Sequence, residues 1–437
     1  QLRKKFGNIF CLQNCWTNVV VLNGYETVKE ALVHRSEDFA DRPYFPIYEH
    51  LGYGMKSQGI VFAKYGHVWK ELRKFTLSTL RNFGMGKKSL ENRVIEEAGF
   101  MCSAISSENG RPFDLRFLVN NAVCNVICTT VYGERFTYGD KTFKEMIRLF
   151  ENSLKEEDGF MTMLFNEVPA LLRIPGVHKR AFRGLKELMD FIDVRVHKHM
   201  DTWDPANTRD ITDAFLKEMD KGKAAEENGF NYDNLRLVTL DLFSAGSETT
   251  ATTLRWAFLY LLLHPEVQKK VQAEIDTVVG RERSPRMEDQ ANMPYTNAVI
   301  HEVQRYGDVV PVGLSHMTYR DIEFQGYFIP KGTTVITNLS SVLKDEAVWE
   351  KPHQFYPEHF LDENGQFVKR DAFMPFSAGR RACLGEQLAR MELFIFFTTL
   401  LQKFTFVIPE DQPKPREEPC FSLICYPHPY QVRALPR

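Results

Sequence analysis

The stretch from 232 to 263 constrains the fold most, because apolar residues keep helical spacing along it without interruption. At about 1.5 Å per residue, a helix of this length crosses a whole globular molecule. We expect it to end at Leu263 and His264, because Pro265 follows and proline is tolerated at the first position of a new helix. A chain built on such a rod must pack further helices around it.

Apolar residues also recur every three or four positions in several other segments. They predict helices over 87–107, 113–132, 141–157, 178–203, 265–279, 294–306 and 385–404. Strand patterns are few: 16–24, which closes on Asn23-Gly24 as a hairpin signal, then 321–338 and 420–427. No linker-like composition divides the chain, so we expect one mainly α domain, 1–437, with a small β region.

Composition excludes several classes of protein. A formal net charge of −2 lacks the basic excess of a nucleic-acid-binding protein. The 8 cysteines show no paired CxxC spacing and are too sparse for a disulfide scaffold, which favours a reduced compartment. No apolar run is long enough to span a bilayer. The chain opens on the basic stretch QLRKKFG, from which we expect that a further N-terminal segment is missing.

Residues 376–385, FSAGRRACLG, place Cys383 at the start of the predicted helix 385–404. Unpaired N–H groups and the dipole of a helix N-terminus stabilise a thiolate. Gly379 and Gly385 allow tight turns and close approach to a flat ligand, and Arg381 offers a fork for a carboxylate. These features suit a cysteine ligand to haem iron, with the arginine on a propionate. The alternative is a buried cysteine beside a surface arginine pair.

Five of these residues complete a family signature. Phe376, Gly379, Arg381, Cys383 and Gly385 match F-x-x-G-x-R-x-C-x-G, and the chain therefore resembles the cytochrome P450 superfamily. The resemblance implies the cytochrome P450 fold, with its long central helix over the haem, and iron protoporphyrin IX (haem b) as cofactor. It also implies Cys383 as the axial ligand.

Two further family marks follow in order. Glu302 and Arg305 form an E-x-x-R pair, which the resemblance implies as a lock for the core near the haem. A zinc motif HExxH is excluded, because Arg305 stands where its second histidine would be. His359 replaces the arginine that usually completes this network, which leaves the protonation of the third member open.

The propionate partners are also implied by the resemblance. Trp69 and Arg73 match W-x-x-x-R, whose two side chains face a propionate, and Arg42 and His316 fall where related enzymes place further partners. The alternative for the last two is a surface arginine and a solvated histidine.

A glycine inside the long helix, Gly246, costs about 1 kcal/mol relative to alanine and needs a reason. We expect it to make room for dioxygen over the haem. Glu248 and Thr249 then supply a carboxylate and a hydroxyl that relay protons to oxygen. The alternative is a helix kink with a solvated glutamate.

Asp241, Ala245 and Thr249 are spaced i, i+4, i+8 and share one helix face. Asp241 either accepts hydrogen bonds from a neighbouring loop or pairs with a protonated amine, and the two can coexist. Stretches such as SAGRRACLGE and MPYTNAVIHEVQR make the chain similar to family 2, subfamily D. That likeness implies basic-amine binding by Asp241 and Glu157, although a solvated helix end is the alternative for the second acid. It implies a pocket lined by Val61, Phe62, Phe421 and Leu423.

No flavin or nicotinamide fingerprint is present, so electrons must come from a partner. Basic residues follow the Trp69 segment and the cysteine loop, either as a docking face for an acidic flavoprotein or as a solvated surface: Lys70, Arg73, Lys74, Arg81, Lys87, Lys88, Arg380 and Lys403. Residues 160–175 are apolar and could form a pocket roof, a surface that dips into a membrane, or both.

The resemblance implies NADPH–cytochrome P450 reductase as partner, with cytochrome b5 as a second candidate. It implies an N-terminal anchor and the cytosolic face of the endoplasmic reticulum membrane. We expect a monooxygenase that hydroxylates or dealkylates lipophilic, often basic-amine small molecules such as xenobiotics. A haem-thiolate isomerase or peroxygenase and a non-catalytic haem sensor are the alternatives.

Overall fold

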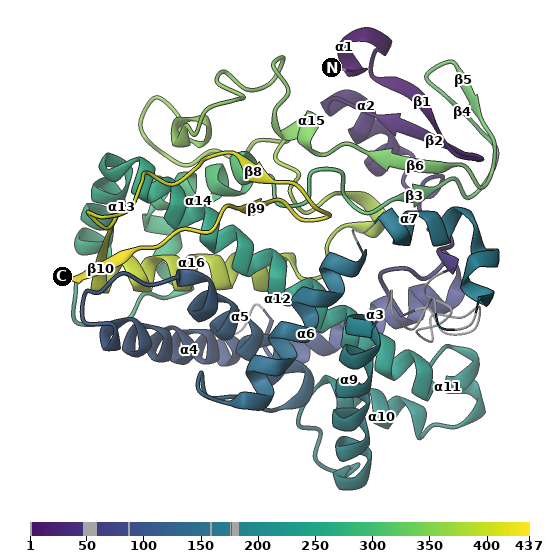
Figure 1. Ribbon diagram of the computed structural model, residues 1–437, viewed down its shortest axis with the longest axis horizontal. Helices are drawn as coiled ribbons and strands as arrows, with labels where there is room; N and C mark the ends of the chain where they lie inside the picture. The colour runs from purple at the N-terminus through teal and green to yellow at the C-terminus, as the bar shows by residue number, and fades with distance from the viewer. Residues whose placement is uncertain (1, 47–58, 86–87, 158–159, 175, 177–182) are drawn as a thin grey trace.

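The computed structural model describes residues 2–46, 59–85, 88–157, 160–174, 176 and 183–437. Helices dominate this part of the chain (Figure 1). The longer ones are α3 (His67–Asn82), α4 (Lys88–Ser107), α5 (Leu115–Tyr132), α6 (Lys141–Glu157), α7 (Phe160–Glu167), α9 (Arg183–Thr202), α10 (Ile211–Met219), α12 (Tyr232–Leu263), α13 (Pro265–Val278), α14 (Pro294–Gly307) and α16 (Glu386–Lys403). Short ones are α1 (Leu2–Phe6), α2 (Tyr25–Lys29), α11 (Lys223–Glu227) and α15 (Ser340–Leu343), with a π-turn at Glu30–His34 and 3-10 turns at Pro169–Arg173, Met287–Asn292, Pro357–Phe360 and Gly379–Arg381.

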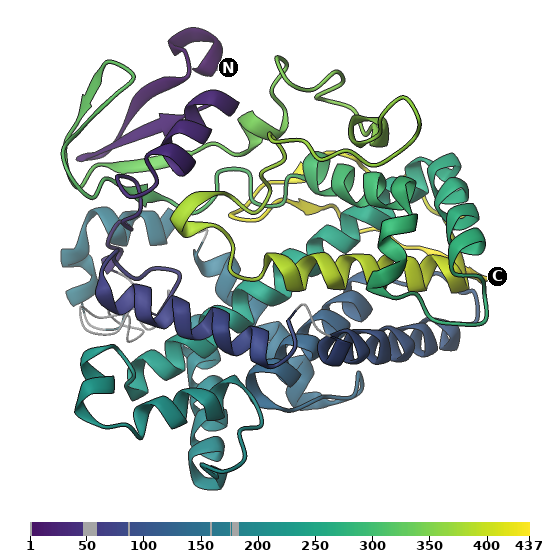
Figure 2. The same cartoon turned by 180° about the vertical axis from the view of Figure 1, so that it is seen from behind.

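The central helix α12 begins and ends where the sequence predicts. The Asn231 side chain caps its first turn by accepting a hydrogen bond from the amide of Asn234 at 2.9 Å. Pro265 then starts α13, because its missing N–H costs nothing at that position. Helix α12 runs through the middle of the molecule and contacts α5 and α16 (Figures 1 and 2). Most of its residues are buried.

The small β region is confirmed, with one correction. One sheet has the order β1 (Ile9–Asn14), β2 (Thr17–Leu22), β6 (Thr334–Thr337) and β3 (His316–Met317). The predicted hairpin turn at Asn23-Gly24 is wrong: the turn lies before β2, and Gly24 precedes α2 instead. The turn at Gln325-Gly326 is confirmed between β4 (Ile322–Phe324) and β5 (Tyr327–Ile329).

Two more strand pairs lie near the C-terminus. Strands β7 (Phe404–Val407) and β10 (Arg433–Pro436) pair antiparallel, and so do β8 (Pro419–Cys420) and β9 (Tyr426–Pro427). The stretch 420–427, predicted as one strand, is therefore a hairpin. Its strands are short, and the residues between them turn the chain back.

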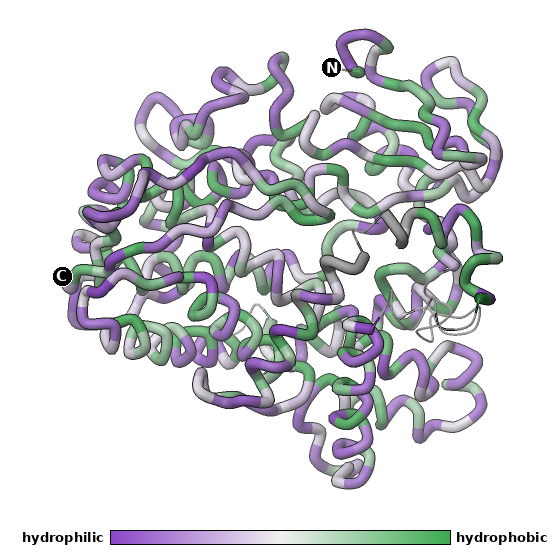
Figure 3. Tube along the Cα trace, viewed as in Figure 1, coloured by the Kyte–Doolittle hydropathy of each residue, from purple (hydrophilic) through white to green (hydrophobic). Residues whose placement is uncertain are grey.

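Two main hydrophobic clusters hold these elements together, beside a third of four residues that includes Trp69. The larger one joins the buried faces of α4, α5, α12 and α16, and the smaller one lies between the four-stranded sheet and the segments around Trp349 and Phe360. Coloured by hydropathy, the chain is hydrophilic along many of its outer loops and hydrophobic along inner helix turns and strands (Figure 3). Within the part of the chain that is described, no helix is both long and apolar enough to cross a membrane.

Candidate haem-thiolate site

The loop before α16 has a shape that only glycine permits at one position. Gly379 has a φ of +72°, and an added Cβ would lie 1.7 Å from the carbonyl oxygen of Leu32. The backbone therefore packs directly against the Glu30–His34 turn. The amide of Cys383 donates a hydrogen bond to the carbonyl of Phe376 at 2.9 Å, which closes the loop and sets the cysteine just before α16.

Cys383 combines an exposed side chain with close protein surroundings. Its side chain is exposed, yet the protein surrounds it closely enough that burial raises the pKa of its thiol. The backbone amides of Gly385 and Glu386 hydrogen-bond to the sulfur and, with the charge of Arg73, favour the thiolate and oppose that rise. The amides of the helix start thus face the sulfur as the sequence predicts, although the protein alone favours the thiol.

Uncovered positions also occur at Gly385 and on α12. A Cβ added at Gly385 would meet no protein atom within 4 Å, so the backbone there borders open space. On α12, Ala245 is exposed although Phe243, Ser247 and Glu248 around it are buried. Cys383, Gly385 and Ala245 are therefore three positions that the side chains of the protein leave uncovered.

Three buried or half-buried arginines gather beside the loop. Arg381 donates to the carbonyls of Ala40 at 2.7 Å and Ala63 at 2.6 Å, and its guanidinium lies 4.1 Å from the ring centre of Trp69. Arg73 donates to the carbonyl of Ala382 at 2.5 Å. Trp69 itself is buried and donates to the carbonyl of Ile60 at 3.2 Å.

Arg42 completes the cluster and His316 borders it. Arg42 donates to the carbonyls of Leu314 and Ser315 at 3.0 and 2.7 Å. The Nδ1 of His316 lies 2.7 Å from the carbonyl oxygen of Phe39, and burial together with Arg42 lowers the pKa of His316 to about 3. The alternatives of a surface arginine and a solvated histidine are therefore wrong, since both side chains are buried.

This cluster fits a ligand with carboxylates. Burial and the neighbouring Arg42 lower the pKa of Arg381 to about 8, and burial and Arg73 lower the pKa of Arg42 to about 10. The charge of Asp41 opposes both shifts, but among the residues described none of the three arginines forms an ion pair with a carboxylate. Buried positive charge of this kind requires compensation. Two propionates of a porphyrin beside a free cysteine sulfur would supply it, so the residues present fit haem.

The oxygen-site residues of α12 differ in orientation. The Thr249 hydroxyl donates to the carbonyl of Ala245 at 2.8 Å, on the face that carries the exposed alanine. A Cβ at Gly246 would lie 2.5 Å from the Cδ1 of Ile127 in α5. The missing side chain of Gly246 therefore lets α5 and α12 approach each other, and its expected role in making room for dioxygen stays a prediction.

Glu248 is buried and held from within the same helix. The Thr252 hydroxyl donates to its Oε1 at 3.1 Å, and Nη1 of Arg255 lies 3.9 Å from the same oxygen. The solvated glutamate considered as an alternative is therefore wrong. Arg255 was missed by the sequence analysis, although an acid and a base seven residues apart on one helix face are a readable signal.

Asp241 binds a loop. Its Oδ2 accepts hydrogen bonds from the amides of Ile60 at 2.6 Å and Val61 at 3.0 Å, and a Cβ at Gly59 would lie 2.4 Å from that oxygen. The structural interpretation of this acid is therefore present in the fold. The amine interpretation stays a prediction.

The predicted pocket residues differ in how exposed they are. Val61 and Phe62 follow the loop that Asp241 holds, and both are half-buried. Phe421, between β8 and β9, is 81% exposed, and Leu423 is half-buried. Glu157 is the last residue of α6, and its side chain lies outside the described part of the structure. Their role as pocket lining stays a prediction.

The E-x-x-R network is fully buried. Glu302 and Arg305 form two hydrogen bonds of 2.7 Å each, and both side chains are 0% exposed. His359 Nδ1 lies 3.2 Å from Glu302 Oε2, while its Nε2 accepts from the amide of Lys351 at 3.0 Å. Because that amide can only donate, Nδ1 carries the proton, and His359 joins the network as a neutral donor.

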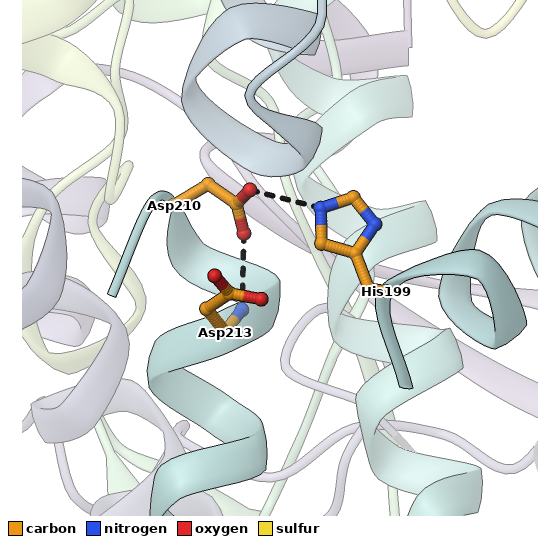
Figure 4. A group of neighbouring side chains, drawn as sticks. All are labelled: His199, Asp210 and Asp213. Carbon is orange, nitrogen blue, oxygen red and sulfur yellow. Dashed lines mark hydrogen bonds and ion pairs between the residues drawn. The ribbon is translucent and has the colours of Figure 1, made fainter. Parts of the chain in front are cut away.

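A second group of titratable residues lies between α9 and α10: His199, Asp210 and Asp213 (Figure 4). Their ligand atoms are close enough to suggest a metal site. Asp213, however, binds Arg209 through two hydrogen bonds of 2.6 and 2.8 Å, and His199 Nε2 lies 2.9 Å from Asp210. These partners make the group an ion-pair network that joins the two helices.

Comparison with known proteins agrees with the geometry. The family profile described as Cytochrome P450 matches residues 1–434. Cytochrome P450 2D14 of Bos taurus is 57% identical over 438 residues, which cover 100% of this chain and 88% of the bovine protein. Cytochrome P450 2D6 of Homo sapiens and cytochrome P450 2D3 of Rattus norvegicus are 56% and 55% identical with the same coverage. The chain therefore belongs to the cytochrome P450 family, whose members are haem-dependent monooxygenases, and within that family it groups with the 2D enzymes.

Proposed function

We propose that this monooxygenase hydroxylates or dealkylates lipophilic, often basic-amine molecules, with dioxygen and with electrons from NADPH–cytochrome P450 reductase. One observation carries the proposal. The loop of Cys383 lies beside three arginines that form no ion pair with a carboxylate within the described part of the chain. When bound there, haem supplies the activation of oxygen. The residues named below hold it, move protons and position the substrate.

The chain would hold haem from two sides. Cys383 ligates the iron through its sulfur, assisted by the amides of Gly385 and Glu386. Arg42, Arg73 and Arg381, with Trp69 and His316 beside them, receive the propionates. Phe376 and Gly379 keep the loop folded, and the uncovered backbone at Gly385 would leave room for a flat cofactor.

Protons would reach the reacting oxygen through Glu248 and Thr249. Thr249 presents its hydroxyl on the face of α12 that carries Ala245, and Glu248 is the adjacent carboxylate. The roles are those of a general acid and a hydroxyl relay. An isomerase or a sensor would need neither side chain.

Asp241 would attract the amine. It lies two helical turns from Thr249 on the same face, which is about 12 Å along the axis. Its carboxylate is buried at 6% exposure among apolar residues such as Leu240 and Phe243, where a negative charge acts strongly on a nearby cation. Glu157, at the end of α6, is the second proposed anchor for basic nitrogen.

Reductase would dock over α3. Lys70, Lys74 and Arg81 are exposed along this helix, whose Arg73 contacts the ligand loop at Ala382. Arg380 is also exposed beside that loop. An acidic flavoprotein or cytochrome b5 bound here would lie next to the residues that hold the haem.

The proposed location is the cytosolic face of the endoplasmic reticulum membrane. Glu167, the last residue of α7, accepts hydrogen bonds from Asn14 at 3.0 Å and Thr17 at 3.2 Å. Trp16, between those two residues, is 76% exposed, and Ile174 beyond α7 is 47% exposed. Exposed apolar side chains of this kind favour contact with a membrane surface.

The test combines a spectrum with turnover. The reduced, carbon-monoxide-bound protein should show the absorbance of thiolate-ligated haem, and Cys383→Ser should abolish it. Purified protein with reductase and NADPH should then oxidise a lipophilic amine. Product formed from a peroxide or by isomerisation, but never with oxygen and reductase, would support the alternative enzymes; a thiolate spectrum without any turnover would support a sensor.

A further inference from the structure

A small hollow opens between the start of α5, the middle of α12 and the C-terminal segment. Its lining residues are Asp114, Arg116, Arg255, Pro429 and Tyr430. All of these residues except Pro429 carry a polar or charged group, and the hollow is roughly large enough for one water molecule. It lies outside the groups assigned above to haem and substrate.

Arg255 connects this hollow to the interior. Its side chain lines the hollow but is only 8% exposed, and Nη1 lies 3.9 Å from Oε1 of the buried Glu248. The Tyr430 hydroxyl donates to the backbone carbonyl of Arg255 at 2.6 Å, and the guanidinium lies 5.8 Å from the ring centre of Tyr426. Contacts at its backbone carbonyl and at its guanidinium therefore hold Arg255 in place.

The contact with Glu248 is electrostatic. A distance of 3.9 Å is too long for a direct hydrogen bond but short for a charge pair with little solvent around it. Thr252 supplies the direct hydrogen bond to the same oxygen at 3.1 Å. Removing a single partner from a buried ion pair leaves an uncompensated charge. The orientation and charge of Glu248 thus depend on a residue that also lines the solvent hollow.

We propose that Arg255 is the positioning residue for Glu248: its charge holds the carboxylate that delivers protons toward the oxygen site. This inference rests on the proposed proton-delivering role of Glu248. A guanidinium has N–H donors and no acceptor, so Arg255 positions the carboxylate and does not relay the proton itself. Solvent water gives a proton to the Glu248 carboxylate, which passes it to the Thr249 hydroxyl, and Thr249 releases its own proton to the reacting oxygen. Each residue ends the cycle with the protons it had at the start.

The experiment uses the haem-loaded enzyme with reductase and compares Arg255→Met, Arg255→Lys and Arg116→Gln. Methionine keeps the length of the side chain and removes the charge; lysine keeps the charge. Arg116 lines the same hollow but pairs with Asp114 at 3.7 Å, so its variant is the matched control. The readouts are product formed per NADPH consumed, peroxide released and the solvent deuterium isotope effect on turnover.

Poorly supplied protons let reduced oxygen leave as peroxide. In Arg255→Met, product per NADPH should fall by about tenfold, a part of what a general acid contributes, with more peroxide and a larger isotope effect. Arg255→Lys should recover much of the coupling, and Arg116→Gln should match the parent. Arg255→Met added to Glu248→Gln should cause no further loss, because both changes act on one group.

The outcomes separate the two ideas. Normal coupling in Glu248→Gln would refute the proton role proposed above, and this inference with it. Impaired Glu248→Gln beside a normal Arg255→Met would refute the inference alone. The amplitude of the carbon monoxide spectrum shows how much enzyme is intact. If Arg255→Met does not fold, Arg255→Lys is measured alone and in combination with Glu248→Gln. An isotope effect equal to that of the parent in Arg255→Lys, with a double variant coupled as well as Glu248→Gln alone, supports the inference, and a further loss in the double variant overturns it.

Discussion

The Asp241 carboxylate lies 2.6 Å from the amide nitrogen of Ile60 and accepts its hydrogen bond, so an acid of the central helix holds the loop that continues into Val61 and Phe62. The same Oδ2 accepts from Val61 at 3.0 Å. A loop-holding acid and an amine-binding acid respond differently to substitution. Asparagine keeps an acceptor oxygen for the loop but removes the charge that would attract an amine.

Asp241→Asn should therefore lower kcat/KM for basic substrates by about 10- to 100-fold, the value of a hydrogen bond to a charged group, and change neutral substrates little. Asp241→Ala, which also releases the loop, should impair both substrate classes. The measurement is kcat/KM for a matched amine and its neutral isostere. Equal losses for both substrates in Asp241→Asn would assign this residue to structure alone.

Gly379→Ala should prevent accumulation of haem-loaded protein, because its Cβ would lie 1.7 Å from the Leu32 carbonyl oxygen. Gly365→Ala is the matched control: Gly365 has the same φ of +72° but no atom within 4 Å of an added Cβ. Its variant should lose only about 1–2 kcal/mol, the backbone cost of alanine in that conformation. Haem absorbance per polypeptide and thermal unfolding measure both effects. Similar behaviour of the two variants would contradict the close packing.

Local signals were sufficient for the main helices. The bounds of α12 follow from Asn231 at its start and Pro265 after its end, and both are visible in the sequence. The cysteine loop was predicted by its residue spacing. The sequence shows a glycine at 379, however, without showing that Leu32, hundreds of residues earlier, forbids any side chain there.

Long-range contacts explain what was missed. Asn23-Gly24 reads as a hairpin turn, but the amide of Gly24 donates to the hydroxyl of Ser341 at 2.8 Å, and this distant contact uses the glycine at a helix start. Gly246 is predicted to make room for a ligand, and the sequence does not show that Ile127 of another helix packs against it as well. In both cases the pattern identifies an unusual backbone position, and only the fold identifies its neighbour.

His199 predicts a pH-dependent stability. Its Nδ1 lies 3.0 Å from the Arg195 carbonyl and its Nε2 2.9 Å from Asp210, so both nitrogens face acceptors and the imidazolium is favoured (Figure 4). Burial lowers the pKa of His199, but the hydrogen bond and charge of Asp210, the Arg195 carbonyl and the charge of Asp213 outweigh it and raise the pKa. Arg209 faces Asp213 from the other side.

Because the folded-state pKa of His199 is raised, its stabilisation is present below its ordinary pKa of about 6.5 and is lost as pH rises through the folded value. Denaturant midpoints measured from pH 6 to pH 9 should fall with rising pH, and His199→Gln should flatten this dependence. His197→Gln, at an exposed position on the same helix, is the control. An unchanged slope in His199→Gln would show that the imidazolium is absent.

The buried acid Glu392 also predicts that the stability of the protein falls as pH rises. It is 1% exposed on α16, and burial raises the pKa of its carboxyl well above the ordinary value, although a hydrogen bond with Thr250 of α12 opposes the rise. Its Oε1 has no hydrogen-bond partner among the described residues. A carboxyl buried this way is favoured as the neutral acid.

Between the unfolded pKa of about 4.3 and the raised folded value, the native state binds more protons than the unfolded state, so stability falls as pH rises. Glutamine mimics the neutral acid and removes this penalty. Glu392→Gln should therefore raise the denaturant midpoint at pH 7.5 more than at pH 5, whereas Glu410→Gln, whose parent side chain is 95% exposed, should do neither. The opposite result would be a loss of stability in Glu392→Gln that grows with pH. It would mean that the buried carboxyl is ionised and paired with a positive charge, because glutamine would then remove a favourable ion pair.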